Sequence, residues 1–297
     1  MRNNRARVDT LRVRKLTSRR RRHTWSTRLL GTSDAKDFFQ LTTETVFEIQ
    51  PFTTPDTAAG LFTVQPYTAH CQVICAEGAH AVIGVSPGNS YFSAQRVIDL
   101  ARWGTAHFEQ VDFVYTDLHV AEMYEASGYT ADDARRKAVK NLRGVRAKVT
   151  NAVATVDPDG RRLRAHPMSA FLDNPAYREI HRHLLSRLAT DPDFRATCDA
   201  LIDAFLSSKV LDGKTPTARQ REVCVEYVCA EAPLFLDTPA ILGVPSSLNC
   251  YHQLLPMAEL LYSRGSGLRA SRNQGHAIVT PARPAQHPAE GDSSDVR

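Results

Sequence analysis

Apolar and polar positions first form a regular pattern near residue 62, where short apolar runs begin to alternate with longer amphipathic segments. Short apolar runs bounded by turn residues predict buried strands. The predicted strands are 72–75, 80–85, 111–116, 161–166 and 275–279, and 244–252 is a further apolar stretch between turns. Segments with one apolar face predict helices at 91–103, 131–154, 175–188, 192–207, 217–231 and 257–262.

The segment from His80 to Thr116 has the order strand, helix, strand. This order predicts a βαβ unit, with parallel pairing and a right-handed crossover. The ligand crevice of such a sheet lies at the carboxyl ends of its strands. Helix 217–231 is predicted to end within Ala230–Leu236.

Ser86 follows the strand 80–85 on a sharp turn, 87–90, that contains proline, glycine and asparagine. Asn89-Ser90 is predicted to cap the next helix, so Ser86 would face a helix N-terminus, where negative charge is stabilised. This location suits a nucleophile, and it equally suits a serine that only caps the helix. Asp117 and His119 leave the next strand at the same rim, but helix capping and loop hydrogen bonding are favoured for these two.

The composition sets limits on the class of protein. The chain has 297 residues, of which 42% are hydrophobic, enough for a sizeable core. No apolar stretch approaches the roughly 18 residues of a membrane span, and the N-terminus lacks the apolar region of a secretory signal. The six cysteines are scattered without a C-x-x-C pair, which suggests neither a disulfide framework nor a zinc site and fits a reducing cytoplasm.

The formal charge of +5 is unevenly distributed. Residues 1–30 hold 11 of the 37 Lys/Arg and one of the 32 acids, which leaves 26 bases and 31 acids for the rest. The basic arm contains Arg19–Arg22; it can attract a polyanion such as RNA, but a solvated tail is favoured. We expect a disordered extension at 1–60 that ends in a linker at 53–60, a single domain at 61–281 and a disordered tail at 282–297.

The predicted helix 131–154 carries many basic residues and almost no acidic ones. Its apolar residues Ala134, Ala138, Leu142, Val145 and Val149 share one arc. Its bases are Arg135, Arg136, Lys137, Lys140, Arg143, Arg146 and Lys148, with no acid between Asp133 and Asp157. A solvated face normally mixes signs, so phosphate binding is favoured over plain solvation.

Two more polar groups are candidates for chemistry. Tyr227 and Glu231 lie four residues apart and share a helix face, and Tyr251-His252 follows a Pro-Ser-Ser turn. A carboxylate on an apolar face has a raised pKa unless it is paired, so Glu231 could exchange protons near neutral pH or hold an ammonium group. Taken alone, Glu231 is better interpreted as a partly exposed residue at the C-terminal end of a helix.

The string Gly84-Val-Ser86-Pro-Gly88 matches the G-x-S-x-G nucleophile elbow. It suggests a serine esterase with Asp237 and His252 as the other triad members. An α/β-hydrolase has more strands before this motif than the sequence has room for here. The sequence also has no HGGG-like oxyanion loop before the motif.

Four stretches in this order resemble the motifs of the cyclodipeptide synthases: Ala81–Phe92, Val114–His119, Tyr227–Phe235 and Val244–His252. The resemblance covers about residues 65 to 281. It implies an α/β fold, a Rossmann-like parallel sheet with helices on both faces, as in the catalytic domain of class I aminoacyl-tRNA synthetases. Their ATP-binding signatures, and any P-loop, are missing from this sequence.

The resemblance implies a ping-pong enzyme that joins two amino acids already esterified to tRNA, with no cofactor and no metal. Ser86 would be acylated by the first aminoacyl-tRNA, and we expect the amine of the second to attack this acyl-enzyme and give a dipeptidyl-enzyme. The free amine of the dipeptide would then close on the Ser86 ester. Tyr227 and Glu231 would hold the first α-ammonium group, with Glu231 also moving protons, and Tyr251 would assist cyclisation.

The remaining site residues are also implied by the resemblance. They are Gly84 and Asn89 beside the nucleophile, His252 in a trio with Asn89 and Tyr251, Tyr177 at the pocket wall, and Val82, Met168, Leu234 and Asn249 in the first side-chain pocket. The basic helix matches the one that binds the tRNA acceptor arm. Asn249 replaces an apolar residue of phenylalanine-using relatives; a buried amide needs a partner, and a tyrosine hydroxyl supplies one. The expected partner is therefore tyrosyl-tRNA, with neither DNA nor a membrane, and a homodimer is left open. A non-catalytic tRNA-binding relative of the synthetases is the third alternative.

Overall fold

The structure is a computed structural model, and it describes residues 58–207, 217–263 and 267–282. The Arg-rich arm, most of the predicted linker 53–60, the turn-rich segment 211–216 and nearly all of the predicted tail lie outside the described residues. Ala59 and Gly60, at the end of that linker, form a 3-10 turn, η1 (Ala59–Leu61).

Strands and helices alternate along the described chain. The strands are β1 (Phe62–Pro66), β2 (His80–Val85), β3 (Gln110–Tyr115), β4 (Leu163–Pro167), β5 (Ser247–Tyr251) and β6 (Gln274–Pro281). The helices are α1 (Ala69–Glu77), α2 (Ala94–His107), α3 (Val120–Ala126), α4 (Ala131–Val156), α5 (Pro175–Thr190), α6 (Pro192–Ser207), α7 (Ala218–Leu242) and α8 (Pro256–Tyr262), with a 3-10 turn η2 (Met168–Phe171). No helix in these described parts has the length and apolar character needed to cross a bilayer.

Within the described residues, the strands form one sheet in the order β1-β6-β5-β2-β3-β4. Only β1 pairs antiparallel; every other neighbouring pair is parallel. The predicted βαβ unit is confirmed, with Ile83 opposite Phe113 in the parallel pair β2–β3. Because β2, β3 and β5 run in one direction, their carboxyl ends meet at one edge of the sheet.

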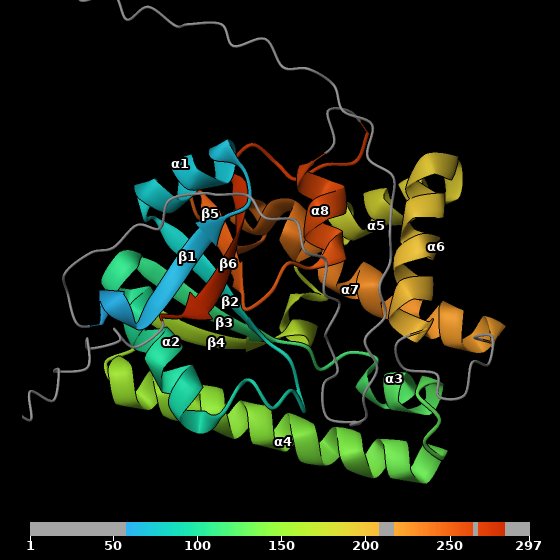
Figure 1. Cartoon of the computed structure of the whole chain (residues 1–297), viewed down its shortest axis with the longest axis horizontal. Helices are drawn as coiled ribbons and strands as arrows, with labels where there is room; N and C mark the ends of the chain where they lie inside the picture. The colour runs from blue at the N-terminus through green and yellow to red at the C-terminus, as the bar shows by residue number, and fades with distance from the viewer. Residues whose placement is uncertain (1–57, 208–216, 264–266, 283–297) are drawn as a thin grey trace, which may run out of the picture. The chain divides into compact units, whose positions relative to one another are not determined.

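Helices cover both faces of the sheet (Figure 1). Helices α1, α2 and α4 pack on one face, and α5 and α7 lie on the other. Successive strand residues point to opposite faces, so Ile83 and Phe113 pack in the core beneath the first set of helices. Val82 and Val114 point the other way and pack against Leu234 of α7.

The predicted strand at 72–75 is wrong, because these residues lie inside α1. Thr68 caps this helix by accepting a hydrogen bond from the backbone N–H of Cys71, and Gly78, with φ +65°, ends it. A four-residue apolar run fits a buried strand and a helix turn equally well. The run alone therefore does not distinguish a strand from a helix.

The helix that was predicted to end within Ala230–Leu236 is longer than expected, although its first break comes directly after Leu236. Helix α7 continues through Pro233 to Leu242, with non-helical backbone at Asp237 (φ −160°, ψ 67°). Burial of Ala232, Pro233 and Leu234 outweighs the hydrogen bond that proline removes. The helical backbone first breaks at Asp237, four residues after Pro233.

Candidate active site

A pocket with a cavity volume of about 150 Å³ lies between the carboxyl ends of β2, β3 and β5 and helix α7. This is the edge at which parallel sheets bind ligands. The predicted residues that line it are Val82, Gly84, Ser86, Met168, Tyr227, Glu231, Leu234, Asn249 and Tyr251. The fold thus gathers both the predicted chemical groups and the predicted first side-chain pocket in one place.

Ser86 leaves β2 at the pocket and contacts a tyrosine from a distant part of the chain. Its Oγ lies 2.9 Å from the hydroxyl of Tyr251, and either oxygen can be the donor. The Tyr251 ring passes so close to Gly84 that an added Cβ would lie 3.3 Å from it, which explains the glycine. Burial raises the pKa of Tyr251 above its ordinary value, so its phenol keeps its proton at neutral pH.

The structure corrects the helix that was predicted to follow Ser86. Helix α2 begins at Ala94 rather than at Tyr91, and its cap is Ser93, whose side chain accepts a hydrogen bond from the backbone N–H of Arg96. Asn89 instead accepts from the backbone N–H of Tyr91 at 2.9 Å, which is a local turn. The alternative in which Ser86 only caps the helix is therefore wrong, because Ser93 is the cap.

Glu231 occupies the pocket wall together with Tyr227 and a threonine that was not predicted. Thr116 Oγ1 donates a hydrogen bond of 2.5 Å to Glu231 Oε1, and Tyr227 also bonds this carboxylate. Burial raises the pKa of Glu231, and the bonds from Thr116 and Tyr227 oppose this rise. Burial, followed by the charge of Glu231, raises the pKa of Tyr227 well above its ordinary value. Glu231 is thus a carboxylate whose charge is partly stabilised by hydrogen bonds from two neutral hydroxyl groups.

Asp117 and His119 do not line the described pocket, although Ser86 does. The Asp117 carboxylate accepts bonds from the Ser169 backbone N–H at 2.8 Å and from its hydroxyl at 2.6 Å. His119 begins α3 with φ 57° and lies 3.8 Å from Glu226. The favoured interpretation, loop hydrogen bonding, is confirmed for Asp117.

The turn that carries Ser86 is held by His252. Asn89 Nδ2 donates to His252 Nε2 at 3.2 Å, and the Tyr91 ring stacks on the imidazole at 4.1 Å between centroids. Burial lowers the pKa of His252 to about 4, so the ring is neutral and its Nε2 is free to accept. Asn89 and His252 therefore support the pocket from outside its lining.

The esterase alternative required a triad of Ser86, His252 and Asp237, and the structure does not assemble one. Ser86 bonds Tyr251, whereas His252 bonds Asn89. Asp237 sits at the kink of α7, where its carboxylate accepts from the backbone N–H of Ala240 and the hydroxyl of Ser271.

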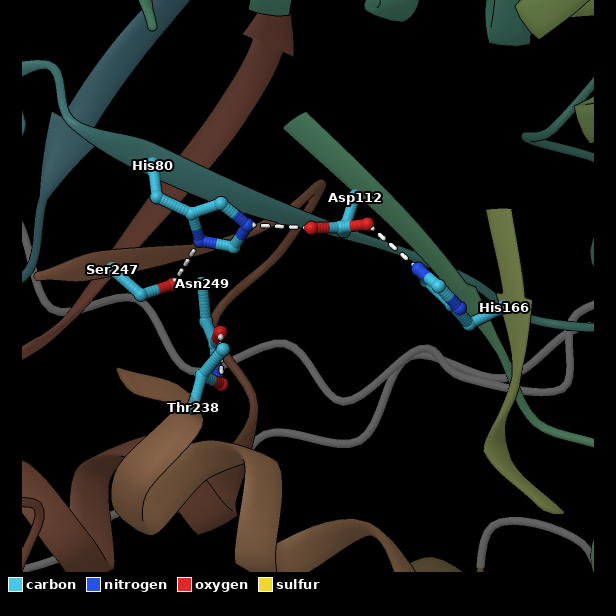
Figure 2. A network of polar contacts seen from close by, with 6 residues as sticks. All are labelled: His80, Asp112, His166, Thr238, Ser247 and Asn249. Atoms are coloured by element: carbon cyan, nitrogen blue, oxygen red, sulfur yellow. Dashed lines mark hydrogen bonds and ion pairs between the residues drawn. The ribbon is translucent and has the colours of Figure 1, made fainter. Parts of the chain in front are cut away.

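Asn249 lies at the base of the pocket, where the kink of α7 supplies its partner. The Thr238 N–H bonds Gln274 instead of continuing the helix, which leaves the Leu234 carbonyl available. That carbonyl accepts from Asn249 Nδ2 at 2.8 Å and from Thr238 Oγ1 at 2.6 Å. Figure 2 shows Thr238 beside Asn249. The hydroxyl of Thr238 has one proton, so its longer contact to Asn249 Oδ1, 3.4 Å, is the weaker alternative.

Two more residues concern this part of the pocket: one that was predicted, Tyr177, and one that was missed, His276. Tyr177 was expected at the pocket wall, but it does not line the described pocket. It packs with Val82 and Met168, and its hydroxyl donates to the Ala230 carbonyl at 2.8 Å. Burial raises the pKa of Tyr177 to about 12. His276, which was not predicted, lines the pocket opposite Asn249 in the β5–β6 pair. Burial lowers the pKa of His276 to about 4, and neither ring nitrogen has a partner of hydrogen-bond geometry among the described residues.

A chain of polar groups, buried except for the half-buried His166, lies on the same face of the sheet and begins at the first residues of β2 and β5 (Figure 2). His80 bonds Ser247 through Nδ1 and Asp112 through Nε2, both at 2.8 Å, and His166 Nε2 bonds the other oxygen of Asp112 at 2.8 Å. Burial raises the pKa of Asp112, but the bonds from His166 and His80 outweigh it and leave that pKa lowered. Asp112 pairs in register with Val82, so the network adjoins the pocket floor.

The basic helix α4 is confirmed, and its seven bases fall into different environments. Arg135 and Arg136 pair with Asp132 and Asp133 of the first turn, while Lys137 bonds the hydroxyl of Tyr129. Lys148 donates to the backbone carbonyl of Phe92. Lys140, Arg143 and Arg146 are exposed and form no ion pair within the part of the chain that the structure describes.

Comparisons with known proteins agree with the motifs. A sequence model of the family described as cyclodipeptide synthase matches residues 62–281. A cyclo(L-tyrosyl-L-tyrosyl) synthase of Mycobacterium tuberculosis is 66% identical over 225 residues, 76% of this chain and 78% of that protein. A cyclo(L-leucyl-L-phenylalanyl) synthase of Streptomyces noursei is 34% identical over 210 residues, 71% of this chain and 88% of that protein.

A solved structure supports the fold in the same way. A protein of Mycobacterium tuberculosis with 66% identity superposes with a TM-score of 0.71 and covers 76% of this chain and 95% of its own. It is described as demonstrating that cyclodipeptide synthetases are related to type I tRNA synthetases. The predicted fold class is therefore confirmed.

Proposed function

The chain belongs to the cyclodipeptide synthase family, and we propose that it joins two molecules of tyrosyl-tRNA into cyclo(L-Tyr-L-Tyr) through a covalent intermediate on Ser86. The observation that carries this proposal is the pocket in which Ser86 Oγ contacts Tyr251 and Glu231 stands opposite on α7. Because aminoacyl-tRNA is made in the cytoplasm, we also propose that compartment for the enzyme.

In the first step, Ser86 Oγ attacks the ester carbonyl of one tyrosyl-tRNA. The bond from that carbon to the ribose oxygen breaks, and the tRNA leaves with the proton that Ser86 gives up. Tyr251 keeps its own proton, since its pKa is raised, and it can donate a hydrogen bond to the serine oxygen as charge develops.

The second step is constrained by the balance of bonds. If the amine of the incoming tyrosyl-tRNA attacked the acyl-enzyme, as the sequence led us to expect, Ser86 would be expelled and the dipeptide would remain on tRNA. For a dipeptidyl-enzyme to form, the amine of the tyrosine already on Ser86 must attack the ester of the incoming tyrosyl-tRNA. The second tRNA then leaves, and the free amine of the dipeptide closes on the Ser86 ester and releases Ser86.

Glu231 suits the proton transfers that these steps need. An α-ammonium group must lose a proton before its nitrogen can attack, and a carboxylate with a raised pKa is a better acceptor than an ordinary one. Tyr227 and Thr116 fix this carboxylate, and they leave its charge available to hold the ammonium group first. The ester bonds supply the free energy, so the proposed reaction consumes no ATP.

Selection of tyrosine rests on the acceptor that Asn249 presents. Its Nδ2 is bound to the Leu234 carbonyl, so Oδ1 is the atom left to accept a hydrogen bond from a phenol. A phenylalanine side chain would leave this buried oxygen with only its long contact to Thr238, which is unfavourable. Val82, Met168 and Leu234 provide the apolar walls.

Binding of the tRNA is assigned to the exposed side of α4. Lys140, Arg143 and Arg146 are exposed and have no ion pair among the described residues, and they recur every three residues, so they extend along one side of the helix. Such contacts to phosphates are independent of sequence and weaken as the salt concentration rises.

The test is to incubate the purified protein with tyrosyl-tRNA and no ATP, and to follow both the product and the intact mass of the protein. We expect cyclo(Tyr-Tyr) and a tyrosyl adduct that maps to Ser86, and we expect both to vanish in Ser86→Ala. Product formation by Ser86→Ala would rule out the nucleophile. Hydrolysis of the ester without any cyclic product would instead favour an esterase.

A further inference from the structure

The turn that carries Ser86 is anchored at its far end by a base of α4. Lys148 Nζ donates a hydrogen bond of 2.7 Å to the backbone carbonyl of Phe92. Lys148 is half-buried, whereas Lys140, Arg143 and Arg146 on the same helix are exposed. Its ammonium group is thus directed toward the protein rather than toward solvent.

This anchor is connected to Ser86 by backbone hydrogen bonds. The Phe92 N–H donates to the Asn89 carbonyl at 3.3 Å, and the Asn89 N–H donates to the Ser86 carbonyl at 3.4 Å. Together with the bond from Lys148, they form an unbroken series from α4 to the serine. A shift of Phe92 would therefore move the backbone of Ser86.

A second contact from α4 supports the same turn seven residues earlier on the helix, and so on the same side of it. Asn141 Nδ2 donates to the hydroxyl of Tyr124 at 2.6 Å, and both groups press against Gly88. A Cβ at Gly88 would lie 2.6 Å from Asn141 Nδ2, and its φ of +76° also favours glycine. The turn therefore rests on α4 at two points.

We propose that Lys148 is a positioning residue for Ser86 and not a phosphate ligand, an inference that rests on the proposed role of Ser86 as nucleophile. Lys148 holds Phe92, and through it the turn, so that Ser86 Oγ stays at the carbonyl carbon of the bound ester. The half-buried side of α4 thereby sets the nucleophile, while its exposed side, with Lys140, Arg143 and Arg146, faces the tRNA. Lys148 differs from the other six bases in acting on the rate of acylation.

The test compares Lys148→Met with Lys140→Met in single-turnover acylation, followed by intact mass, over a range of tyrosyl-tRNA and salt concentrations. For Lys148→Met we expect the acylation rate at saturation to fall about tenfold to a hundredfold, since small displacements of a reacting atom have effects of this size. KM and the salt dependence should stay within about twofold of wild type, because a positioning residue makes no phosphate contact. Lys140→Met should raise KM and reduce the slope of log KM against log salt by roughly 0.7 to 0.9.

Lys148→Arg keeps a charged donor and should recover most of the lost rate. The inference is overturned if Lys148→Met raises KM and lowers the salt slope while acylation at saturation is normal, or if Lys148→Arg is as slow as Lys148→Met. If Lys148→Met cannot be purified, Asn141→Ala removes the second support, and an unchanged acylation rate in that variant also overturns it. Failure of the proposed function is separate: it appears as an adduct in Ser86→Ala, whatever Lys148 does.

Discussion

The two faces of the sheet are built from the same strands but differ in the polarity of the side chains that they bury. Toward α1, α2 and α4, the strands present only apolar side chains, such as Ile83 and Phe113. Every strand residue that is both buried and polar, within the described chain, points to the opposite face: His80, Asp112, Ser247, Asn249, Gln274 and His276. The first face needs only good packing, whereas each polar group on the second needs a partner.

This difference assigns stability and function to separate faces. Among the described residues, no buried strand residue with a charged, amide, imidazole or serine side chain lies on the apolar face, whereas Val82 and Asn249 of the pocket lie on the other. Substitutions on the two faces should therefore fail in different ways, and the following changes test that division.

The largest loss of stability is expected on the apolar face. Phe113→Ala leaves a cavity in a fully buried site and should lower the free energy of unfolding by about 3 to 5 kcal/mol, measured by urea denaturation. The deficit should not vary with pH, because no titrating group is removed. A deficit that disappeared in acid would contradict the division between the faces.

On the pocket face, Asp112→Asn removes the charge that His80 and His166 share, and should destabilise by about 3 kcal/mol at pH 7. The pKa of Asp112 is lowered in the folded protein, so its contribution is complete above an unfolded pKa of about 4 and is lost as the pH falls through the folded value. The deficit of the variant should therefore shrink below about pH 4. A deficit independent of pH would show that the carboxylate acts only through its shape.

Thr116→Val should affect the chemistry more than the fold. It removes a donor to the Glu231 carboxylate, a bond that contributes about 1.5 to 3 kcal/mol to the charged form, so the pKa of Glu231 should rise further. As the pH falls, activity that requires ionised Glu231 would then begin to decline at a higher pH than in the wild type. The acid limb of the kcat/KM profile should therefore move up by about one pH unit. Thr105→Val, on α2, is the matched control, and an equal shift there would refute the assignment.

The smallest effect is expected in the choice of side chain. Asn249→Leu should reduce the preference for tyrosyl-tRNA over phenylalanyl-tRNA about tenfold, which corresponds to about 1.4 kcal/mol. Leu248 is adjacent on β5 but points to the apolar face, so Leu248→Met should leave the preference unchanged. If the preference is unchanged in Asn249→Leu, another polar group of the pocket must select tyrosine over phenylalanine.

The sequence was most informative where local rules coincide with tertiary structure. The strand His80–Val85 and the helix Pro192–Ser207 have the predicted bounds, because turn residues or prolines mark their limits. The run 72–75 was misassigned although Thr68 and Gly78, the two caps, were present in the sequence. Helix α7 passes Pro233 because of its burial, which a local pattern does not record.

The candidate site was foreseen through its motifs rather than through its geometry. Ser86 and Tyr251 are 165 residues apart, and no periodicity predicts their contact. Thr116 was overlooked, although it lies two residues beyond Val114 and so on the same face. The partnership of His80, Asp112 and His166 depends on strand order, which the sequence did not provide.

The carbonyl of Leu234, exposed by the kink of α7, has two donors where one would suffice. If Asn249 is lost, Thr238 still satisfies this carbonyl, so the helix tolerates the change. The position that is proposed to face the substrate can therefore change without leaving this carbonyl unsatisfied. This second donor makes residue 249 a suitable position for single substitutions aimed at other cyclic dipeptides, because such changes should spare the fold.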